Sequence, residues 1–212
     1  MTAPGFARAV VESAWRRAAR ARYRTEMALA DDWEPVAVDP AVDALSDASR
    51  ILYLCLGNVC RSPFAQRLTE RKLAKRGVAD VRIDSAGLST TDGRSSPETA
   101  VAVAREYGIN LGPHRAMEVR QTDIEQADVV FLMDLNNYWR LRRLGAARDA
   151  DCYFLGVLDD PSDPEIDDPY GDPPDTFRDV YGRIETGVQR VVEALEPSVT
   201  ESSGSEHVHE WD

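Results

Sequence analysis

The chain has 212 residues, of which 43% are hydrophobic, and its formal net charge is -12. This length and apolar content suit one domain with extensions and exclude a wholly disordered protein. The net acidity argues against a general nucleic-acid binder, and no apolar run approaches the roughly 18 residues of a membrane span. Three cysteines are too few for a disulfide framework. We therefore expect an acidic, cytoplasmic protein.

Residues 1–49 are expected to form an N-terminal extension. Phe6–Tyr23 is rich in Ala and Arg and predicts a basic helix, whereas residues 26–47 carry seven acids and no base, which is typical of a linker. Contact of the basic helix with a membrane surface is one interpretation, but a solvated helix is favoured because charge blocks are common on exposed segments. At the other end, the Ser- and Glu-rich residues 196–212 are expected to be a disordered acidic tail.

Residues 50–195 alternate between strand-like and helix-like patterns. Short apolar runs predict four strands, at residues 51–54, 81–83, 128–133 and 152–155. Helical patterns with proline or glycine near their ends predict helices at residues 63–77, 97–107, 136–144 and 177–195. Strands that alternate with helices indicate βαβ units. We therefore expect an α/β, three-layer fold with a four-stranded parallel sheet flanked by helices.

The spacing Cys55-x5-Arg61-Ser62 falls between the first predicted strand and the first predicted helix. A loop at a helix N-terminus directs free backbone N–H groups into one concavity, which suits a tetrahedral anion and favours the thiolate form of a cysteine. Arg61 offers a planar fork for two phosphate oxygens, and Ser62 places a hydroxyl near the sulfur. Gly57 and Asn58 tolerate the left-handed backbone that turns N–H groups inward. The pattern therefore predicts a phosphate-binding loop with Cys55 as nucleophile.

With these residues in view, the run Leu54–Pro63 resembles the phosphate-binding loop of the low-molecular-weight protein-tyrosine phosphatases. The resemblance extends over about residues 50–195 and includes four further motifs: Asp84-Ser85-Ala86-Gly87, His114-Arg115-Ala116, Met133-Asp134 and Asp168-Pro169-Tyr170-Gly171. It implies a domain with the phosphate-binding loop after the first strand. It also implies hydrolysis of phosphotyrosine or other aryl phosphate monoesters through a cysteinyl-phosphate, without a metal or organic cofactor.

Residue by residue, the resemblance assigns the catalytic roles to Cys55, Arg61 and Asp168, the last as general acid. Residues 159–175 carry eight acids and no base, so composition alone does not choose the acid. Ser85 and His114 match positions that brace the loop, and Leu88 and Tyr170 are expected to wall the substrate slot. The remaining positions expected to bind or support phosphate are Leu56, Gly57, Asn58, Val59, Cys60 and Ser62.

Several alternatives stay open on the sequence. Cys60 resembles a second loop cysteine that captures an oxidised Cys55 as a disulfide, or else it is a small side chain packed under the loop. Arsenate reduction on the same fold is a rival activity, although it needs further cysteines and only Cys152 remains. A non-catalytic phosphotyrosine reader is a second rival.

The expected substrate is a phosphotyrosine protein or a small phosphomonoester, and the sequence leaves phosphotyrosine and phosphoarginine both open. The stretch Leu88-Ser89-Thr90-Thr91 has no aromatic residue. That pattern looks like the bacterial branch linked to tyrosine-kinase control of polysaccharide export. A bacterial tyrosine kinase is therefore a candidate partner.

Overall fold

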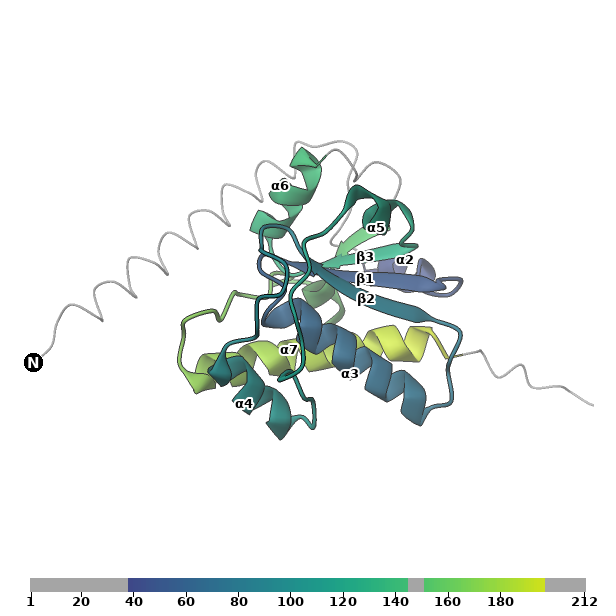
Figure 1. Ribbon diagram of the computed structural model, residues 1–212. Helices are drawn as coiled ribbons and strands as arrows, with labels where there is room; N and C mark the ends of the chain where they lie inside the picture. Colours follow the sequence, from purple (N-terminus) through teal and green to yellow (C-terminus); the bar gives the residue numbers. More distant parts are fainter. Residues whose placement is uncertain (1–37, 145–150, 197–212) are drawn as a thin grey trace, which may run out of the picture. The chain divides into compact units, whose positions relative to one another are not determined.

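The computed structural model describes residues 38–144 and 151–196 (Figure 1). Its centre is one sheet in which four parallel strands follow the order β2-β1-β3-β4. The strands are β1 (Arg50–Cys55), β2 (Arg82–Gly87), β3 (Val129–Leu132) and β4 (Asp151–Phe154). Since β1 pairs with both β2 and β3, its last residue ends in the middle of the sheet's carboxyl edge. The predicted four-stranded parallel sheet is confirmed.

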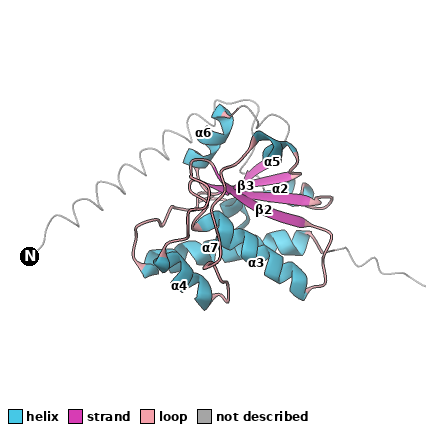
Figure 2. Ribbon diagram, in the orientation of Figure 1, coloured by secondary structure: helices cyan, strands magenta, loops and turns pink. Residues whose placement is uncertain are grey.

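Helices cover both faces of this sheet, which confirms the three-layer prediction (Figure 2). On one side lie α3 (Arg61–Lys75), α4 (Glu98–Glu106) and α7 (Pro174–Ala194). On the other side lie α5 (Gln121–Glu125) and α6 (Leu135–Arg143). Among the described residues, no helix combines the length and hydropathy needed to cross a bilayer.

The strands read as continuous apolar runs because both faces of the sheet are buried. In β1, Ile51 and Tyr53 face the main core beneath α3 and α7, while the alternate residues Leu52 and Leu54 are equally buried outside that cluster. Across the core, the rings of Phe64 in α3 and Tyr181 in α7 stack with centroids 3.8 Å apart. This packing fixes the N-terminal turn of α3 against α7, at the end of α3 that adjoins the loop after β1.

Residues 38–48 correct the predicted linker. A short helix, α2 (Val38–Asp43), occupies part of the acidic segment. Ala41 and Leu45 are fully buried and belong to the main core cluster. The hydrophobic residues there are spaced for one packed face, which outweighs the acidic composition that suggested a linker. The predicted helix at Phe6–Tyr23 and nearly all of the predicted tail lie outside the described residues.

Other differences concern the ends of elements and short turns. α3 begins at Arg61 rather than at Pro63, so Arg61 and Ser62 are in its first turn. The sequence did not predict α5 or the 3-10 helix η1 (Leu155–Leu158), each of five residues or fewer. Elements this short carry too few residues to show a hydrophobic period.

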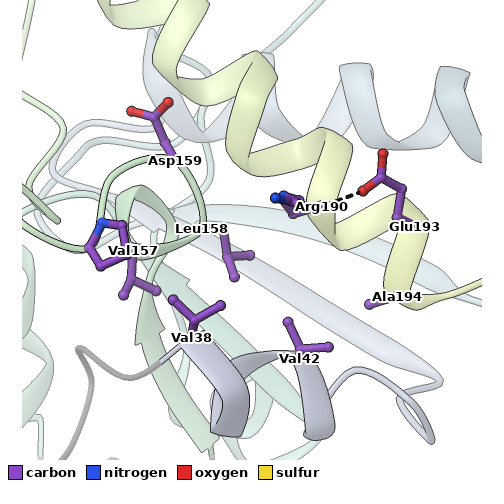
Figure 3. A pocket seen from close by; sticks show the side chains of 9 residues that line it. Val38, Val42, Val157, Leu158, Asp159, Arg190, Glu193 and Ala194 are labelled. Atoms are coloured by element: carbon purple, nitrogen blue, oxygen red, sulfur yellow. Dashed lines mark ion pairs between the residues drawn. The ribbon is translucent and has the colours of Figure 1, made fainter.

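A hollow of about 420 Å³ lies between α2, the end of η1 and α7 (Figure 3). Its walls are mainly aliphatic, with an Arg190–Glu193 ion pair on the α7 side. None of residues 55–62 lines it. The hollow is therefore separate from the loop that the sequence identified as functional.

Candidate active site

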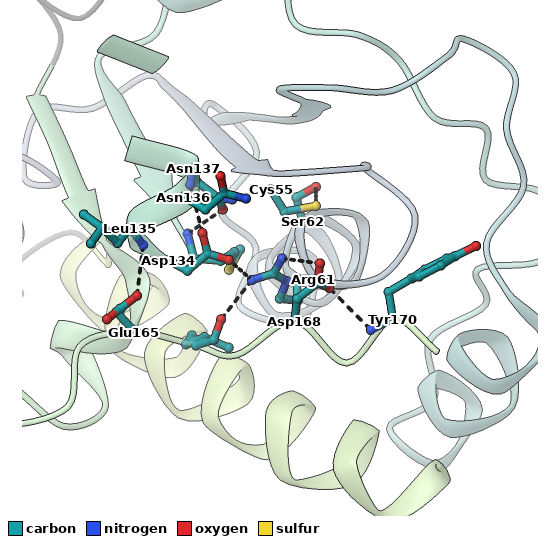
Figure 4. A network of polar contacts seen from close by, with 12 residues as sticks. Cys55, Arg61, Ser62, Asp134, Leu135, Asn136, Asn137, Glu165, Asp168 and Tyr170 are labelled. Carbon is teal, nitrogen blue, oxygen red and sulfur yellow. Dashed lines mark hydrogen bonds and ion pairs between the residues drawn. The ribbon is translucent and has the colours of Figure 1, made fainter. Parts of the chain in front are cut away.

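The loop between β1 and α3 surrounds the sulfur of Cys55, and we call residues 55–62 the phosphate loop. Cys55 is the last residue of β1 and is 3% exposed. The Asn58 N–H donates to Cys55 Sγ at 3.2 Å, and Ser62 Oγ lies 3.0 Å from the same sulfur (Figure 4). With the first turn of α3 directly behind them, these groups are placed to stabilise negative charge on the sulfur.

Asn58 holds the phosphate loop in its curved shape. Its φ of 48° lies in the left-handed region, which asparagine tolerates better than most residues. Its side-chain amide donates to Ser62 Oγ at 2.9 Å and to Ser85 Oγ at 3.0 Å, and its backbone carbonyl bonds to His114 Nε2 at 2.7 Å. The structure thus brings Ser85 and His114 together on one buried loop residue.

His114 donates its Nε2 proton in this contact, because a carbonyl oxygen can only accept. Burial lowers the pKa of His114, and the hydrogen bond to the Asn58 carbonyl opposes that shift. The positive charges of Arg67 and Arg115 lower the pKa further. The neutral ring with its proton on Nε2 is therefore the form that supports the loop.

Arg61 is the most constrained charge of the site. Its side chain is 1% exposed, and its Nη1 donates to Asp134 Oδ2 at 2.5 Å and to the Ile166 carbonyl at 2.9 Å. Its Nη2 lies 3.1 Å from Asp168 Oδ2 (Figure 4). Burial opposes the charged form, but the two carboxylates outweigh it and raise the Arg61 pKa. Arg61 Nε is buried and has no hydrogen-bond partner among the described residues, so a donor is left for an anion.

Asp134 is a functional residue that the sequence reasoning quoted within a motif but did not assign to the site. Its Oδ2 accepts from Arg61, and its Oδ1 accepts the N–H of Asn137 at 2.8 Å, which caps α6. The available signal was positional. A carboxylate that follows β3 lies at the same carboxyl edge of the sheet as Cys55, where parallel sheets place their ligands.

The predicted general acid lies on the segment between η1 and α7, residues 159–173, which we call the acid loop. The Asp168 side chain is 37% exposed, and its Oδ1 accepts the N–H of Tyr170 at 3.4 Å. Tyr170 is 54% exposed, and the guanidinium carbon of Arg94 lies 4.9 Å from its ring centroid. The predicted Tyr170 ring thus lies close to Asp168 in the chain, and it contacts Arg94, a cation that the sequence reasoning did not identify.

The other predicted positions lie in the phosphate loop or against it. Leu88, predicted as a wall of the substrate slot, is 8% exposed, and its N–H donates to the Cys55 carbonyl at 2.9 Å. Cys60 is buried, its carbonyl accepts from Tyr181 Oη at 3.3 Å, and burial raises the pKa of its thiol. The remaining loop positions are Leu56 and Gly57, which are partly exposed, and Val59, which is buried.

Comparison with known proteins agrees with this geometry. The low molecular weight phosphotyrosine protein phosphatase family matches residues 50–201. The probable low molecular weight protein-tyrosine-phosphatase AmsI of Erwinia amylovora is 34% identical over 145 residues, which cover 68% of this chain and 96% of AmsI. Low molecular weight protein-tyrosine phosphatase A of Mycobacterium tuberculosis is 33% identical over 149 residues, which cover 68% and 90% of the two chains.

Solved structures give the same relationship. The crystal structure of Erwinia amylovora AmsI has a TM-score of 0.63 and 32% identity, covering 71% of this chain and 95% of that one. The YwlE arginine phosphatase from Geobacillus stearothermophilus has a TM-score of 0.61 and 30% identity, covering 69% and 92%. The chain therefore belongs to the low molecular weight phosphotyrosine protein phosphatase family and is a cysteine-dependent phosphatase.

Proposed function

We propose that this protein hydrolyses phosphotyrosine and related aryl phosphate monoesters, with Cys55 as nucleophile, Arg61 as phosphate ligand and Asp168 as general acid. The observation that carries the proposal is the buried Arg61 guanidinium. Two carboxylates and a backbone carbonyl fix it, yet its Nε has no hydrogen-bond partner in the part of the chain that the structure describes. A phosphate oxygen satisfies that donor, and the rigid fork supplies the charge that a transferring phosphoryl group requires.

In the first step, the Cys55 thiolate attacks phosphorus in line, and the bond between phosphorus and the aryl oxygen breaks. Arg61 and the N–H groups of the phosphate loop hold the non-bridging oxygens. Ser62 Oγ, 3.0 Å from Sγ, is placed to stabilise the thiolate before attack and as leaving group. Asp168 gives its proton to the departing phenolate oxygen, which leaves as a phenol.

In the second step, water attacks the phosphorus of the cysteinyl-phosphate. The Asp168 carboxylate takes a proton from that water, the sulfur–phosphorus bond breaks, and Cys55 leaves as thiolate while inorganic phosphate is released.

The direct test is release of phosphate from p-nitrophenyl phosphate and from a phosphotyrosine peptide by the purified protein in the presence of a metal chelator. We expect hydrolysis of both. Activity that disappears with the chelator and returns with a divalent cation would contradict the cysteinyl-phosphate mechanism.

Phosphoarginine is a second candidate substrate, because the solved YwlE structure at 30% identity is named an arginine phosphatase. Parallel assays on peptides that differ only in phosphotyrosine, phosphoarginine or phosphoserine decide between them. We expect phosphotyrosine to be preferred, since the exposed Tyr170 ring offers an aromatic wall to an aryl group.

Arsenate reduction receives less support from the cysteines. Cys152 lies in β4, which is separated from β1 by β3, and it is buried. It is therefore poorly placed to relay a disulfide from Cys55. The assay that separates the activities measures arsenate-dependent thiol oxidation beside phosphate release.

We infer a cytoplasmic location and a bacterial tyrosine kinase, or a substrate of one, as the partner. Cys55, Cys60 and Cys152 are all free thiols, as expected in a reducing compartment. The E. coli relative Wzb, named a low molecular weight protein-tyrosine-phosphatase, is 30% identical over 147 residues. Coexpression with a tyrosine autokinase, followed by anti-phosphotyrosine detection, tests whether the kinase is dephosphorylated.

A further inference from the structure

Arg183, in the middle of α7, holds the acid loop from outside the phosphate loop. Its Nε donates to Asp159 Oδ2 at 2.8 Å, and its Nη1 donates to the Glu165 carbonyl at 2.7 Å. Its Nη1 also lies 3.4 Å from Asp163 Oδ2, and its Nη2 donates to the Asp163 carbonyl. One guanidinium thus bonds to three residues of the loop, through both side chains and backbone.

The contact with the Glu165 carbonyl is next to the part of the acid loop that carries Asp168. Glu165, whose carbonyl Arg183 binds, precedes Ile166, whose carbonyl accepts from Arg61. The Ile166 N–H donates to the Met133 carbonyl at 2.6 Å, and the Ile166 side chain is fully buried. Asp168 follows two residues later. Arg183 and Arg61 therefore bind the carbonyls of two adjacent residues, a short distance in the chain before the Asp168 carboxylate.

The inner part of the acid loop also fits closely against η1. A Cβ placed on Gly156 would lie 2.3 Å from the Pro164 carbonyl oxygen, so the loop backbone passes within contact distance of this glycine. The loop carries several carboxylates that repel one another when left unpaired. Arg183 neutralises Asp159 and Asp163 at the point where this close approach occurs.

We propose that Arg183 is a positioning residue for the general acid: it fixes the acid loop so that Asp168 meets the leaving oxygen. The assignment rests on the proposed function, and it concerns a residue outside the motifs that carry the family resemblance. It predicts a specific kinetic signature, because a displaced acid slows only those reactions that need protonation of the leaving group.

The test compares Arg183→Gln with Arg178→Gln. Arg178 is a matched control in the same helix, paired with Glu106 and Asp175 rather than with residues 159–165. For each protein, kcat/KM is measured on a series of aryl phosphates whose phenols range from acidic to weakly acidic. This ratio covers all steps through release of the phenol.

For Arg183→Gln we expect a loss in kcat/KM of about tenfold or more on the poorest leaving groups and little loss on the best. Inhibition by inorganic phosphate should be unchanged, and Arg178→Gln should behave as wild type. Arg183→Gln added to Asp168→Asn should cost little further activity, since the acid is already absent. Equal losses across the series, or losses that add in the double variant, would overturn the proposal.

A second measurement does not depend on turnover. Hydrogen–deuterium exchange of the amides in residues 159–170 should be faster in Arg183→Gln than in wild type and unchanged in Arg178→Gln. Unchanged exchange in Arg183→Gln would overturn the positioning role even if the wild type hydrolysed no aryl phosphate. Absence of hydrolysis in the wild type, with faster exchange in the variant, would instead count against the proposed function alone.

Discussion

The phosphate loop and the acid loop meet where Arg61 contacts Ile166 and Asp168, and they differ in burial and in the contacts that hold them. The phosphate loop is one continuous run with hydrogen bonds among Cys55, Asn58 and Ser62. Ser85 and His114 also brace Asn58 from outside the loop. Asn58 and Ser62 are fully buried there. In the acid loop, Asp168 and Tyr170 retain substantial exposure. Contacts that hold this loop come from other parts of the chain, among them Met133, Leu135, Arg61 and Arg183.

This difference fits the different tasks of the two side chains. The Cys55 thiolate must be positioned before substrate binds, whereas Asp168 acts first as acid and then as base. A thiolate needs fixed donors around it, which a short buried loop provides at low cost in chain entropy. The acid must first give and then take a proton, and it must let substrate and product pass. An exposed loop anchored at a few points allows both.

Replacing the nucleophile has the largest expected effect on this arrangement. Cys55→Ser should lower turnover on the order of 10⁴-fold or more, because the covalent path is lost. Binding of inorganic phosphate should persist, since Arg61 and the loop N–H groups remain. Steady-state kinetics check the loss of turnover, and calorimetry checks that phosphate binding persists. Unchanged turnover would rule out Cys55 as nucleophile.

The next largest effect is expected from removal of the general acid, Asp168, in the acid loop. Asp168→Asn should lower kcat/KM about 10²–10⁴-fold on aryl phosphates with weakly acidic phenols and far less on p-nitrophenyl phosphate. Asp167→Asn is a neighbouring control, and its kinetics should remain close to wild type. If both substrates lost activity equally in Asp168→Asn, its role would be electrostatic rather than proton transfer.

The same contrast explains what the sequence could predict. The phosphate loop is contiguous, so its residue types and the flanking strand and helix were all visible in ten residues. Two anchors of the acid loop lie outside it in the chain: Arg183 follows it in α7, and Met133 precedes it, directly after β3. Neither position has a local pattern that marks it. Only the family resemblance chose Asp168 among eight acids.

Composition misled in one place, at residues 38–48. Their acids suggested a linker, but Ala41 and Leu45 are fully buried in the core. The family match begins only at residue 50, so α2 lies outside it and still packs on the domain. A small number of apolar residues is enough to bury one side of a charged segment when those residues share one face of a helical turn.

The brace behind the phosphate loop gives a pH-dependent prediction. The folded protein keeps His114 neutral below the ordinary pKa of about 6.5, whereas the unfolded chain takes up the proton there. Stability should therefore fall as pH is lowered through this region, because the unfolded state binds more protons. In His114→Gln, which retains a donor, that part of the pH dependence should vanish.

Thermal unfolding of wild type and His114→Gln between pH 5 and 7.5 checks this. At neutral pH the variant should lose about 0.5–1.5 kcal/mol if its new hydrogen bond is imperfect. For a chain of this size each kcal/mol corresponds to about 2–4 °C in Tm. The two curves should converge toward acid pH, and parallel curves would show that His114 does not titrate in this window.

The smallest expected effect concerns Arg94, whose guanidinium lies over the Tyr170 ring of the acid loop. Arg94 is exposed, so its charge is available to a substrate. Arg94→Glu should lower kcat/KM about two- to fivefold for a phosphotyrosine peptide with acidic neighbours, the size of an exposed charge contact. A neutral peptide and p-nitrophenyl phosphate should respond less, and added salt should reduce the difference.

Arg82→Glu makes the same charge change at the opposite end of β2 from Gly87, the partner of Cys55, and should leave the peptide preference intact. Equal responses of the acidic and neutral peptides to Arg94→Glu would mean that the Arg94 charge does not interact with the acidic residues of the peptide.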